Sequence, residues 1–258
     1  IPLICASILA KKLAEGTEVL VGDVKFGRGA FMRDKVKARE LAQTLVAVST
    51  AMGTPMRAIL TAMDEPLGRA VGNALEVVES IDCLQGKGPA DTMEVTFALG
   101  EEMLVLSGVT KTAAAARKKL EASIASGAAL QKFRDLVAAQ GGDVRVIDDP
   151  ARLPQARLKV SLAGSRAGFV HEVDALGVAL AALRLGAGRA KAEGRIDPAV
   201  GFSDLVKIGE RVETGGRLAT IHANDETALA EAKAMLARAI VVGDGSAKAP
   251  KLIEEVVG

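Results

Sequence analysis

Two side chains near the start of the sequence have the spacing needed to bind one small polar ligand together. Ser7 and Lys11 lie four residues apart in the segment SILAKK. Residues four apart share one face of a helix, so the hydroxyl and the ammonium can both reach a carbonyl and imide edge. Considered alone, a serine near a lysine is more typical of a solvated helix surface. Lys12, directly after Lys11, favours that plainer interpretation.

The stretch that follows this pair combines an apolar strand with a glycine loop. The run VLVGDVKF is followed by GRGAFM. In this segment Gly27 and Gly29 allow positive φ or the close approach of another group to the backbone. Backbone N–H groups in a G-x-G turn can bind an anion, but this motif is neither a P-loop nor a full dinucleotide fingerprint. The residues alone therefore leave the ligand of this loop open.

Other familiar catalytic patterns are missing from the sequence. It contains no HExxH, CxxC or GxSxG motif, and its two histidines, His171 and His222, have no clear nucleophile or carboxylate triad beside them. We expect both histidines to be structural. Cys5 and Cys83 lie far apart in dissimilar contexts, so we expect two free thiols in a reducing compartment.

The opening block resembles the thymidine and pyrimidine-nucleoside phosphorylases. The residues that carry the resemblance are, in order, Ser7, Lys11, Lys12, Asp23, Lys25, Gly27, Gly29, Ala30, Phe31 and Met32. The resemblance covers nearly the whole chain and is strongest over residues 1–85 and 165–225. In the later part it rests on residues 170–188, on DPAVG at 197–201 and on TIHAN at 220–224.

This resemblance implies a role for each residue of the opening block. Ser7 and Lys11 would bind the pyrimidine ring, and Lys11 would stabilise the negative charge on the departing base. Ile4 and Phe31 would form apolar walls around the base, although ordinary core packing explains these two equally well. The glycine loop would shape the rim of the cleft rather than bind phosphate, with Asp23 and Lys25 forming a pair nearby.

A second family segment implies a cation site. The run PLGRAVGNALEVVE at 66–79 resembles the segment that holds a monovalent cation in some members. The ligands here would be the backbone carbonyls of Leu67 and Ala70 and the carboxylate of Glu79, an oxygen set that suits a hard, potassium-like cation. Without the resemblance, Glu79 reads as a normal exposed helix carboxylate. No other cofactor is expected to be required.

Alternating patterns predict the elements that position these residues. We expect helices near 3–15, 35–52, 73–84, 91–107, 111–125, 127–140, 175–185 and 226–240, and strands near 18–25, 57–62, 144–147, 157–162 and 168–172. The order strand, helix, strand over 18–62 implies a parallel crossover. Glycines between short strands over 206–222 resemble a barrel-sandwich hairpin. The fold class is therefore α/β, a mixed central sheet flanked by helices, followed by a small α+β domain with barrel-sandwich character.

The resemblance also implies a domain plan. Residues 1–15 would end a helical domain, 16–160 would form the α/β domain, and 161–258 the C-terminal α+β domain. Family members carry a phosphate loop, a histidine near it and a base-binding arginine that cannot be mapped here. We therefore expect this chain to carry the base-binding half of the site, with an N-terminal portion absent, and to be inactive in isolation.

Composition narrows the partners. The 258 residues carry 33 basic and 32 acidic side chains, a net charge of +1, and only 2% aromatic residues, which argues against a nucleic-acid surface. No apolar run of about 18 residues predicts a membrane span, and no signal peptide is evident at the start. We expect a cytoplasmic protein that forms a homodimer when full-length.

The function that follows is reversible phosphorolysis: a pyrimidine nucleoside and phosphate give the free base and a pentose 1-phosphate. The sequence leaves thymidine against uridine preference open. Two alternatives stay open as well. One is a nucleoside-monophosphate phosphorylase of the same architecture. The other is a non-catalytic lipoyl- or biotinyl-like module, which would need a modified lysine at a hairpin tip that this sequence lacks.

Overall fold

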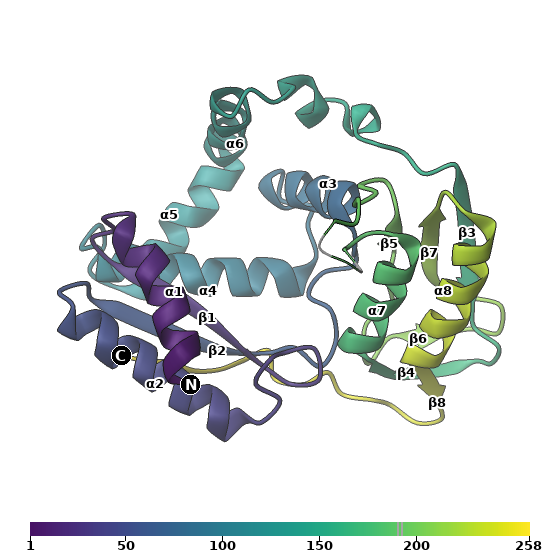
Figure 1. The fold of residues 1–258 in the computed structure, drawn as a ribbon, viewed down its shortest axis with the longest axis horizontal. Coiled ribbons are helices and arrows are strands. Elements are labelled where there is room, and N and C mark those ends of the chain that lie inside the picture. The colour runs from purple at the N-terminus through teal and green to yellow at the C-terminus, as the bar shows by residue number, and fades with distance from the viewer. Residues whose placement is uncertain (190, 192) are drawn as a thin grey trace. The chain divides into compact units, whose positions relative to one another are not determined.

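The computed structural model describes residues 1–189, 191 and 193–258. These residues divide into two compact units, each built from separated stretches of chain (Figure 1). Unit 1 contains residues 1–63, 91–123 and 250–258, and unit 2 contains residues 64–90 and 124–249. The predicted three-part division at residues 15 and 160 stays a prediction.

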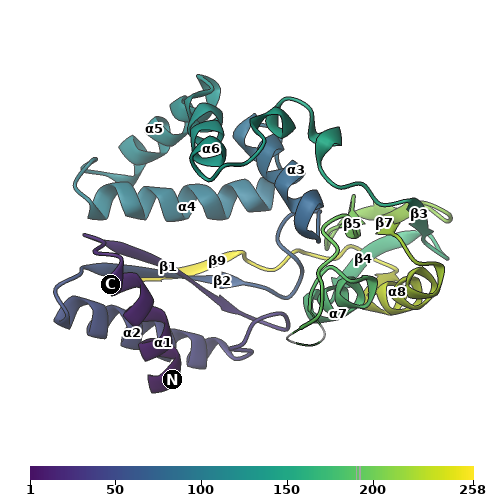
Figure 2. The ribbon, with the colours of Figure 1, turned by 45° about the horizontal axis from the view of Figure 1, so that its top comes forward.

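Unit 1 is a small mixed sheet with helices on both faces. Strands β1 (Leu20–Phe26) and β2 (Met56–Ala62) pair in parallel, and β9 (Ile253–Val257) pairs antiparallel to β2. Helices α1 (Pro2–Ala14) and α2 (Lys35–Ala51) lie on one face, and α4 (Ala90–Leu106) lies on the other (Figure 2). Helix α5 (Ala113–Ala125) follows α4. The parallel crossover from β1 through α2 to β2 is confirmed.

The sequence explains why α2 and the strands pack in this way. Asp34 caps α2 by accepting a hydrogen bond from the amide of Lys37 at 3.0 Å. The helix buries an apolar face against the sheet, and alternate strand residues complete the same core. The buried members of this core are Cys5, Leu9, Val24, Ala38, Leu41, Ala42, Leu45, Met56, Ala58 and Leu60.

Unit 2 contains two three-stranded sheets around one apolar core. One sheet has the order β3-β7-β5 and the other β6-β4-β8, and every pair is antiparallel. The strands are β3 (Leu158–Ala163), β4 (Gly168–Val173), β5 (Gly201–Ser203), β6 (Arg211–Val212), β7 (Arg217–Ala223) and β8 (Ile240–Gly243). Phe202, Val170, Ile221 and Leu236 are fully buried in the core.

Helices α3 (Asn73–Leu84), α7 (Ala175–Leu185) and α8 (Glu226–Ala239) contact strands of these two sheets, whereas α6 (Ala128–Ala139) contacts α3. Asp225 caps α8 by accepting a hydrogen bond from the amide of Ala228 at 2.7 Å. The predicted fold class is confirmed: the described residues form small sheets flanked by helices and include no closed barrel.

The structure corrects one predicted strand and adds three. Residues Val144–Ile147 form a 3-10 helix rather than a strand. Asp143 accepts hydrogen bonds from the amide of Arg145 and, through its carbonyl, from that of Val146, and this local turn overrides the β-branched composition. The short strands β5, β8 and β9 were not predicted, since three to five residues give too little alternation to detect. None of the described helices is long and apolar enough to cross a membrane.

The close approach of two backbones in unit 2 gives a first prediction. Val71 and Phe202 exchange backbone hydrogen bonds of 2.9 and 2.8 Å. Gly201 has φ +146°, and a Cβ there would lie 2.0 Å from the carbonyl oxygen of Val71. Gly215 also has positive φ, +77°, but a Cβ there would meet nothing within 4 Å.

We expect Gly215→Ala to cost about 1–2 kcal/mol, the steric cost of its backbone conformation alone. Gly201→Ala should cost at least twice as much, because the overlap can be relieved only by separating Val71 from Phe202. Urea unfolding of the two variants measures the difference. Equal losses would show that the approach at Gly201 is not needed for stability.

Candidate functional site

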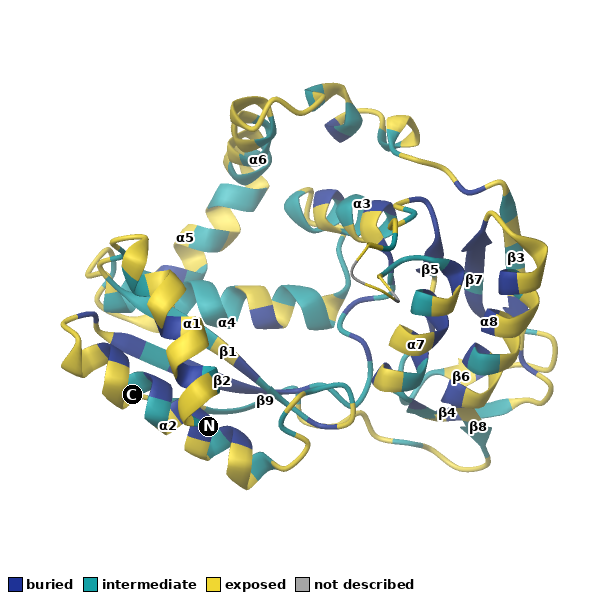
Figure 3. Cartoon of the chain, in the orientation of Figure 1, coloured by how far each residue is buried: buried dark blue, intermediate teal, exposed yellow. Residues whose placement is uncertain are grey.

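Helix α1 presents the predicted base-binding residues as one stripe. Cys5 and Leu9, each 3% exposed, anchor the helix on the core of unit 1. Figure 3 shows that α1 has both buried and exposed positions. Ile4, Ser7 and Lys11 follow the spacing i, i+3, i+7, so they share a face that points away from Leu9. Ser7 and Lys11 are exposed, whereas Ile4 is half-buried and packs against the edge of the core. The predicted pairing of Ser7 and Lys11 on one helix face is therefore present.

The polar groups of this stripe are not used by the fold. Neither the Ser7 hydroxyl nor the Lys11 ammonium makes a hydrogen bond or ion pair with any residue that the structure describes. The neighbouring Lys12, in contrast, lies 3.4 Å from Glu15 and pairs with it along the helix. Lys11 thus has its full donor capacity for a ligand, while Lys12 is part of a surface ion pair.

The glycine loop after β1 is closed by its own backbone. The amide of Gly27 donates to the carbonyl of Met32 at 3.3 Å, that of Ala30 to Gly27 at 3.1 Å, and that of Gly29 to Met63 at 2.9 Å. These N–H groups are occupied and cannot form an anion nest. Phe31, carried by this loop, is 85% exposed, so the core-packing explanation of Phe31 is wrong. The loop shapes the surface and displays an aromatic ring.

The predicted pair between Asp23 and Lys25 is confirmed. The Lys25 ammonium lies 2.5 Å from Asp23 Oδ2 and 2.9 Å from Thr61 Oγ1. Thr61 in turn donates to Asp23 Oδ1 at 2.5 Å. The three side chains come from adjacent parallel strands and lie on the sheet face opposite Val24. This network fixes the end of β1 from which the glycine loop departs.

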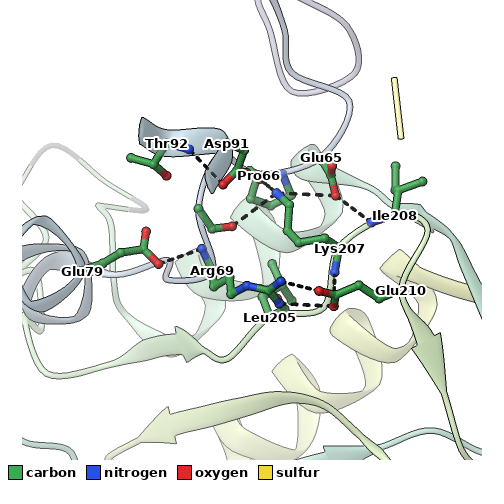
Figure 4. A network of polar contacts seen from close by, with 11 residues as sticks. Glu65, Pro66, Arg69, Glu79, Asp91, Thr92, Leu205, Lys207, Ile208 and Glu210 are labelled. Atoms are coloured by element: carbon green, nitrogen blue, oxygen red, sulfur yellow. Dashed lines mark hydrogen bonds and ion pairs between the residues drawn. The ribbon is translucent and has the colours of Figure 1, made fainter. Parts of the chain in front are cut away.

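The predicted cation ligands lie in unit 2, on residues 64–71 and on α3. We call residues 64–71 the β2–α3 loop. Glu79 accepts a hydrogen bond from the amide of Arg69 at 2.8 Å, which holds the carboxylate against the loop (Figure 4). Ala70 is 7% exposed and Leu67 is half-buried. The structure thus brings the three residues to one loop and the helix that follows it.

The carbonyls of this loop allow the predicted ligand set to be tested. Five of them have protein donors: Asp64 accepts from the amide of Ala175, Pro66 and Gly68 from Lys207 Nζ, Arg69 from the amide of Leu205, and Val71 from the amide of Phe202. The carbonyls of Leu67 and Ala70 accept no hydrogen bond from any described residue. These are the two carbonyls that the resemblance assigns to a cation, so the residues present fit a hard monovalent ion.

A cavity of about 670 Å³ in unit 2 is lined in part by Ala70 and Glu79. Its floor is the outer face of the sheet β3-β7-β5, which presents Lys159, Ser203 and His222. Asp204, also in the lining, has φ +53° and is the one described non-glycine residue with positive φ. Sequence reasoning did not single out Ser203 or Asp204, and their single-residue signal in the sequence is weak.

His222 is held neutral at this floor. It is 7% exposed, and its Nε2 lies 2.9 Å from Ser203 Oγ. Burial lowers the pKa of His222 below its ordinary 6.5, and the nearby Lys159 ammonium lowers it further, against an opposing effect of Asp204. His171, in contrast, is exposed, and its Nε2 lies 3.1 Å from the carbonyl oxygen of Asp244. No described carboxylate is hydrogen-bonded to His222, so the pair with Ser203 is not a catalytic triad.

Comparison with known families places both halves of the chain. Residues 2–130 match the a/b domain of a glycosyl transferase family, and residues 169–243 match the pyrimidine nucleoside phosphorylase C-terminal domain. The first match covers β1, β2 and the helices around them, and the second covers most of the two antiparallel sheets. The chain therefore contains the a/b domain of a glycosyl transferase family.

Individual relatives narrow the class. The chain is 44% identical over 257 residues to the pyrimidine-nucleoside phosphorylase of Bacillus subtilis and 43% identical to that of Geobacillus stearothermophilus. It is 46% identical over 224 residues to the enzyme of that name from Staphylococcus aureus. The chain belongs to the pyrimidine-nucleoside phosphorylase family. It spans 59% of the length of the first two relatives and 52% of the third.

The buried imidazole gives a prediction about pH. The pKa of His222 is lower in the folded protein than in the unfolded chain, so at pH values below 6.5 the unfolded chain binds more protons. The free energy of unfolding should therefore fall as the pH is lowered below 6.5. His222→Gln should remove this part of the pH dependence. His171→Gln is the control and should retain it. Urea unfolding at pH of about 7.5 and about 5.5 measures both slopes; identical slopes in the two variants would contradict the assignment.

Proposed function

We propose that the protein containing this chain catalyses phosphorolysis of pyrimidine nucleosides. A phosphate oxygen bonds to the anomeric carbon of the sugar while the glycosidic C–N bond breaks. The bonding pair leaves with the base, and the products are the free pyrimidine and a pentose 1-phosphate. The names of the relatives support the reaction, and the unpartnered hydroxyl and ammonium of Ser7 and Lys11 are the observation in this chain that carries it.

The stripe on α1 would act on the departing base. Lys11 would donate to a ring carbonyl, where negative charge grows as the C–N bond breaks, and charge stabilised there lowers the barrier. Ser7, one turn earlier, would hold the neighbouring ring nitrogen and so orient the base. Ile4 and the exposed ring of Phe31 would provide apolar contact for the two ring faces.

A potassium-like cation is part of this proposal. The carbonyl oxygens of Leu67 and Ala70 and the carboxylate of Glu79 would hold it, and its charge would fix the β2–α3 loop on helix α3. The lack of donors to these two carbonyls among the described residues supports this choice. The cation would take no part in bond breaking.

The share of the site carried by this chain is also a proposal. The chain spans 59% of the length of the Bacillus subtilis relative. We propose that residues of this chain contact the base, and we assign no contact with phosphate to them. We propose a cytoplasmic homodimer for the whole protein, which light scattering and cell fractionation would test. The matched pyrimidine nucleoside phosphorylase C-terminal domain favours this function over a nucleoside-monophosphate phosphorylase or a lipoyl-like module.

Lysine substitutions on α1 test the function. In a longer protein that includes these residues, Lys11→Ala should lower kcat/KM for thymidine and uridine by about 10²–10³, the usual loss when one donor to a developing anion is removed. Lys12→Ala should change it less than about twofold, because Lys12 is paired with Glu15 on the surface. Release of free base at saturating phosphate measures both.

The control separates a role of Lys11 from a general effect of charge on α1. An equal loss of kcat/KM in the two variants would contradict the proposal that Ser7 and Lys11 bind the base. A folded wild-type protein that releases no base from either nucleoside would contradict the proposed reaction itself.

A further inference from the structure

The β2–α3 loop divides its carbonyl oxygens between two kinds of partner. Those of Pro66 and Gly68 face the ammonium of Lys207, at 2.5 and 3.3 Å from Nζ. Those of Leu67 and Ala70 receive no donor from the part of the chain that the structure describes. The oxygen atoms committed to Lys207 and those left for a cation are therefore close neighbours in sequence.

Lys207 behaves as a cation built into the protein. Its side chain is only 14% exposed, and the carboxylate of Glu65, also 14% exposed, lies 3.5 Å from Nζ. Two carbonyls and one carboxylate thus face the three N–H donors of the ammonium (Figure 4). A buried ammonium with all its donors matched holds its oxygen ligands firmly, since leaving them would cost the solvation it has already lost.

The backbone around Lys207 is anchored to the same loop. The amide of Lys207 donates to Glu210 at 3.0 Å, and Glu210 forms a two-pronged ion pair with Arg69. The amide of Ile208 donates to Glu65 at 3.0 Å. Lys207 therefore cannot shift without breaking contacts at both ends of its side chain, so it is suited to dictate the shape of the loop.

We propose that Lys207 is a positioning residue for the monovalent-cation site formed by Leu67, Ala70 and Glu79. By binding the carbonyls of Pro66 and Gly68, it orders the loop before the ion arrives, so that the remaining two carbonyls are already placed. The inference rests on the proposed cation site, because without a bound cation Lys207 would serve stability alone.

Lys207 has two opposite effects on the binding of a nearby cation, and we expect the favourable effect to be the larger. Preorganisation strengthens cation binding, because the ion does not have to order the loop itself. Coulomb repulsion between two positive charges weakens it, but the negative charge of Glu65 offsets the ammonium. Removing the ammonium should therefore weaken cation binding rather than strengthen it.

The test is a potassium titration of the protein, read as the thermal unfolding midpoint at constant ionic strength with choline chloride as the balancing salt. Lys207→Met should raise the half-saturating potassium concentration at least tenfold. Lys132→Met is the matched control: it removes a lysine from α6 in the same unit, where the ammonium is 84% exposed and 4.0 Å from Asp135. It should leave the half-saturating concentration unchanged.

Two more variants separate the inference from the cation site itself. Glu79→Gln should abolish the potassium response. Lys207→Arg keeps the charge and several donors, so its half-saturating concentration should lie between those of wild type and Lys207→Met. If Lys207→Met unfolds too easily to titrate, amide hydrogen exchange of residues 64–71 in Lys207→Arg gives the same information. Exchange there should be faster than in wild type without potassium and slowed by adding it.

The outcomes distinguish the two levels of the proposal. No potassium response in wild type would overturn the cation site and this inference with it. A wild-type response that Glu79→Gln abolishes but Lys207→Met leaves unchanged, or makes tighter, would overturn the role of Lys207 while the cation site stands. In the exchange experiment, rates in Lys207→Arg equal to wild type would likewise overturn it.

Discussion

The pairing of the β2–α3 loop with residues 202–210 is the contact on which unit 2 depends. These segments are far apart in sequence, yet Val71 and Phe202 exchange backbone hydrogen bonds, and Arg69 pairs with Glu210. Gly201, with its Cα against the Val71 carbonyl, permits the approach. Through this contact α3 belongs to unit 2, with the antiparallel sheets, and unit 2 consists of two separate stretches of chain.

In unit 1, the short helix α1 exposes polar groups on one face and is held in place by its other face. Cys5 and Leu9 hold α1 on the core with one face, so the opposite face is free to carry Ser7 and Lys11. A helix of 13 residues is marginal alone, and its stability comes from that packed face. Because no residue that the structure describes pairs with the Lys11 ammonium, its N–H donors are available to a ligand.

The cavity of unit 2 brings charged and titratable side chains together over the polar face of a sheet. Arg69, Lys87 and Lys159 line it together with Glu79, Asp82 and Asp204, so its formal charges balance. His222 stays neutral beside Lys159 because burial disfavours its charged form. The proposed cation ligands Ala70 and Glu79 also line this cavity.

The sequence by itself determined most of the elements and the stripe on α1, because helical spacing brings Ser7 and Lys11 together whatever the rest of the chain does. Only the tertiary structure decided that Phe31 is exposed and that Lys207, Glu65 and the β2–α3 loop meet. The meeting of Lys207 with the loop depends on contacts between residues 141 and 139 positions apart, those of Lys207 with Pro66 and Gly68. No local pattern in a sequence records which distant partner pairs with a charged side chain.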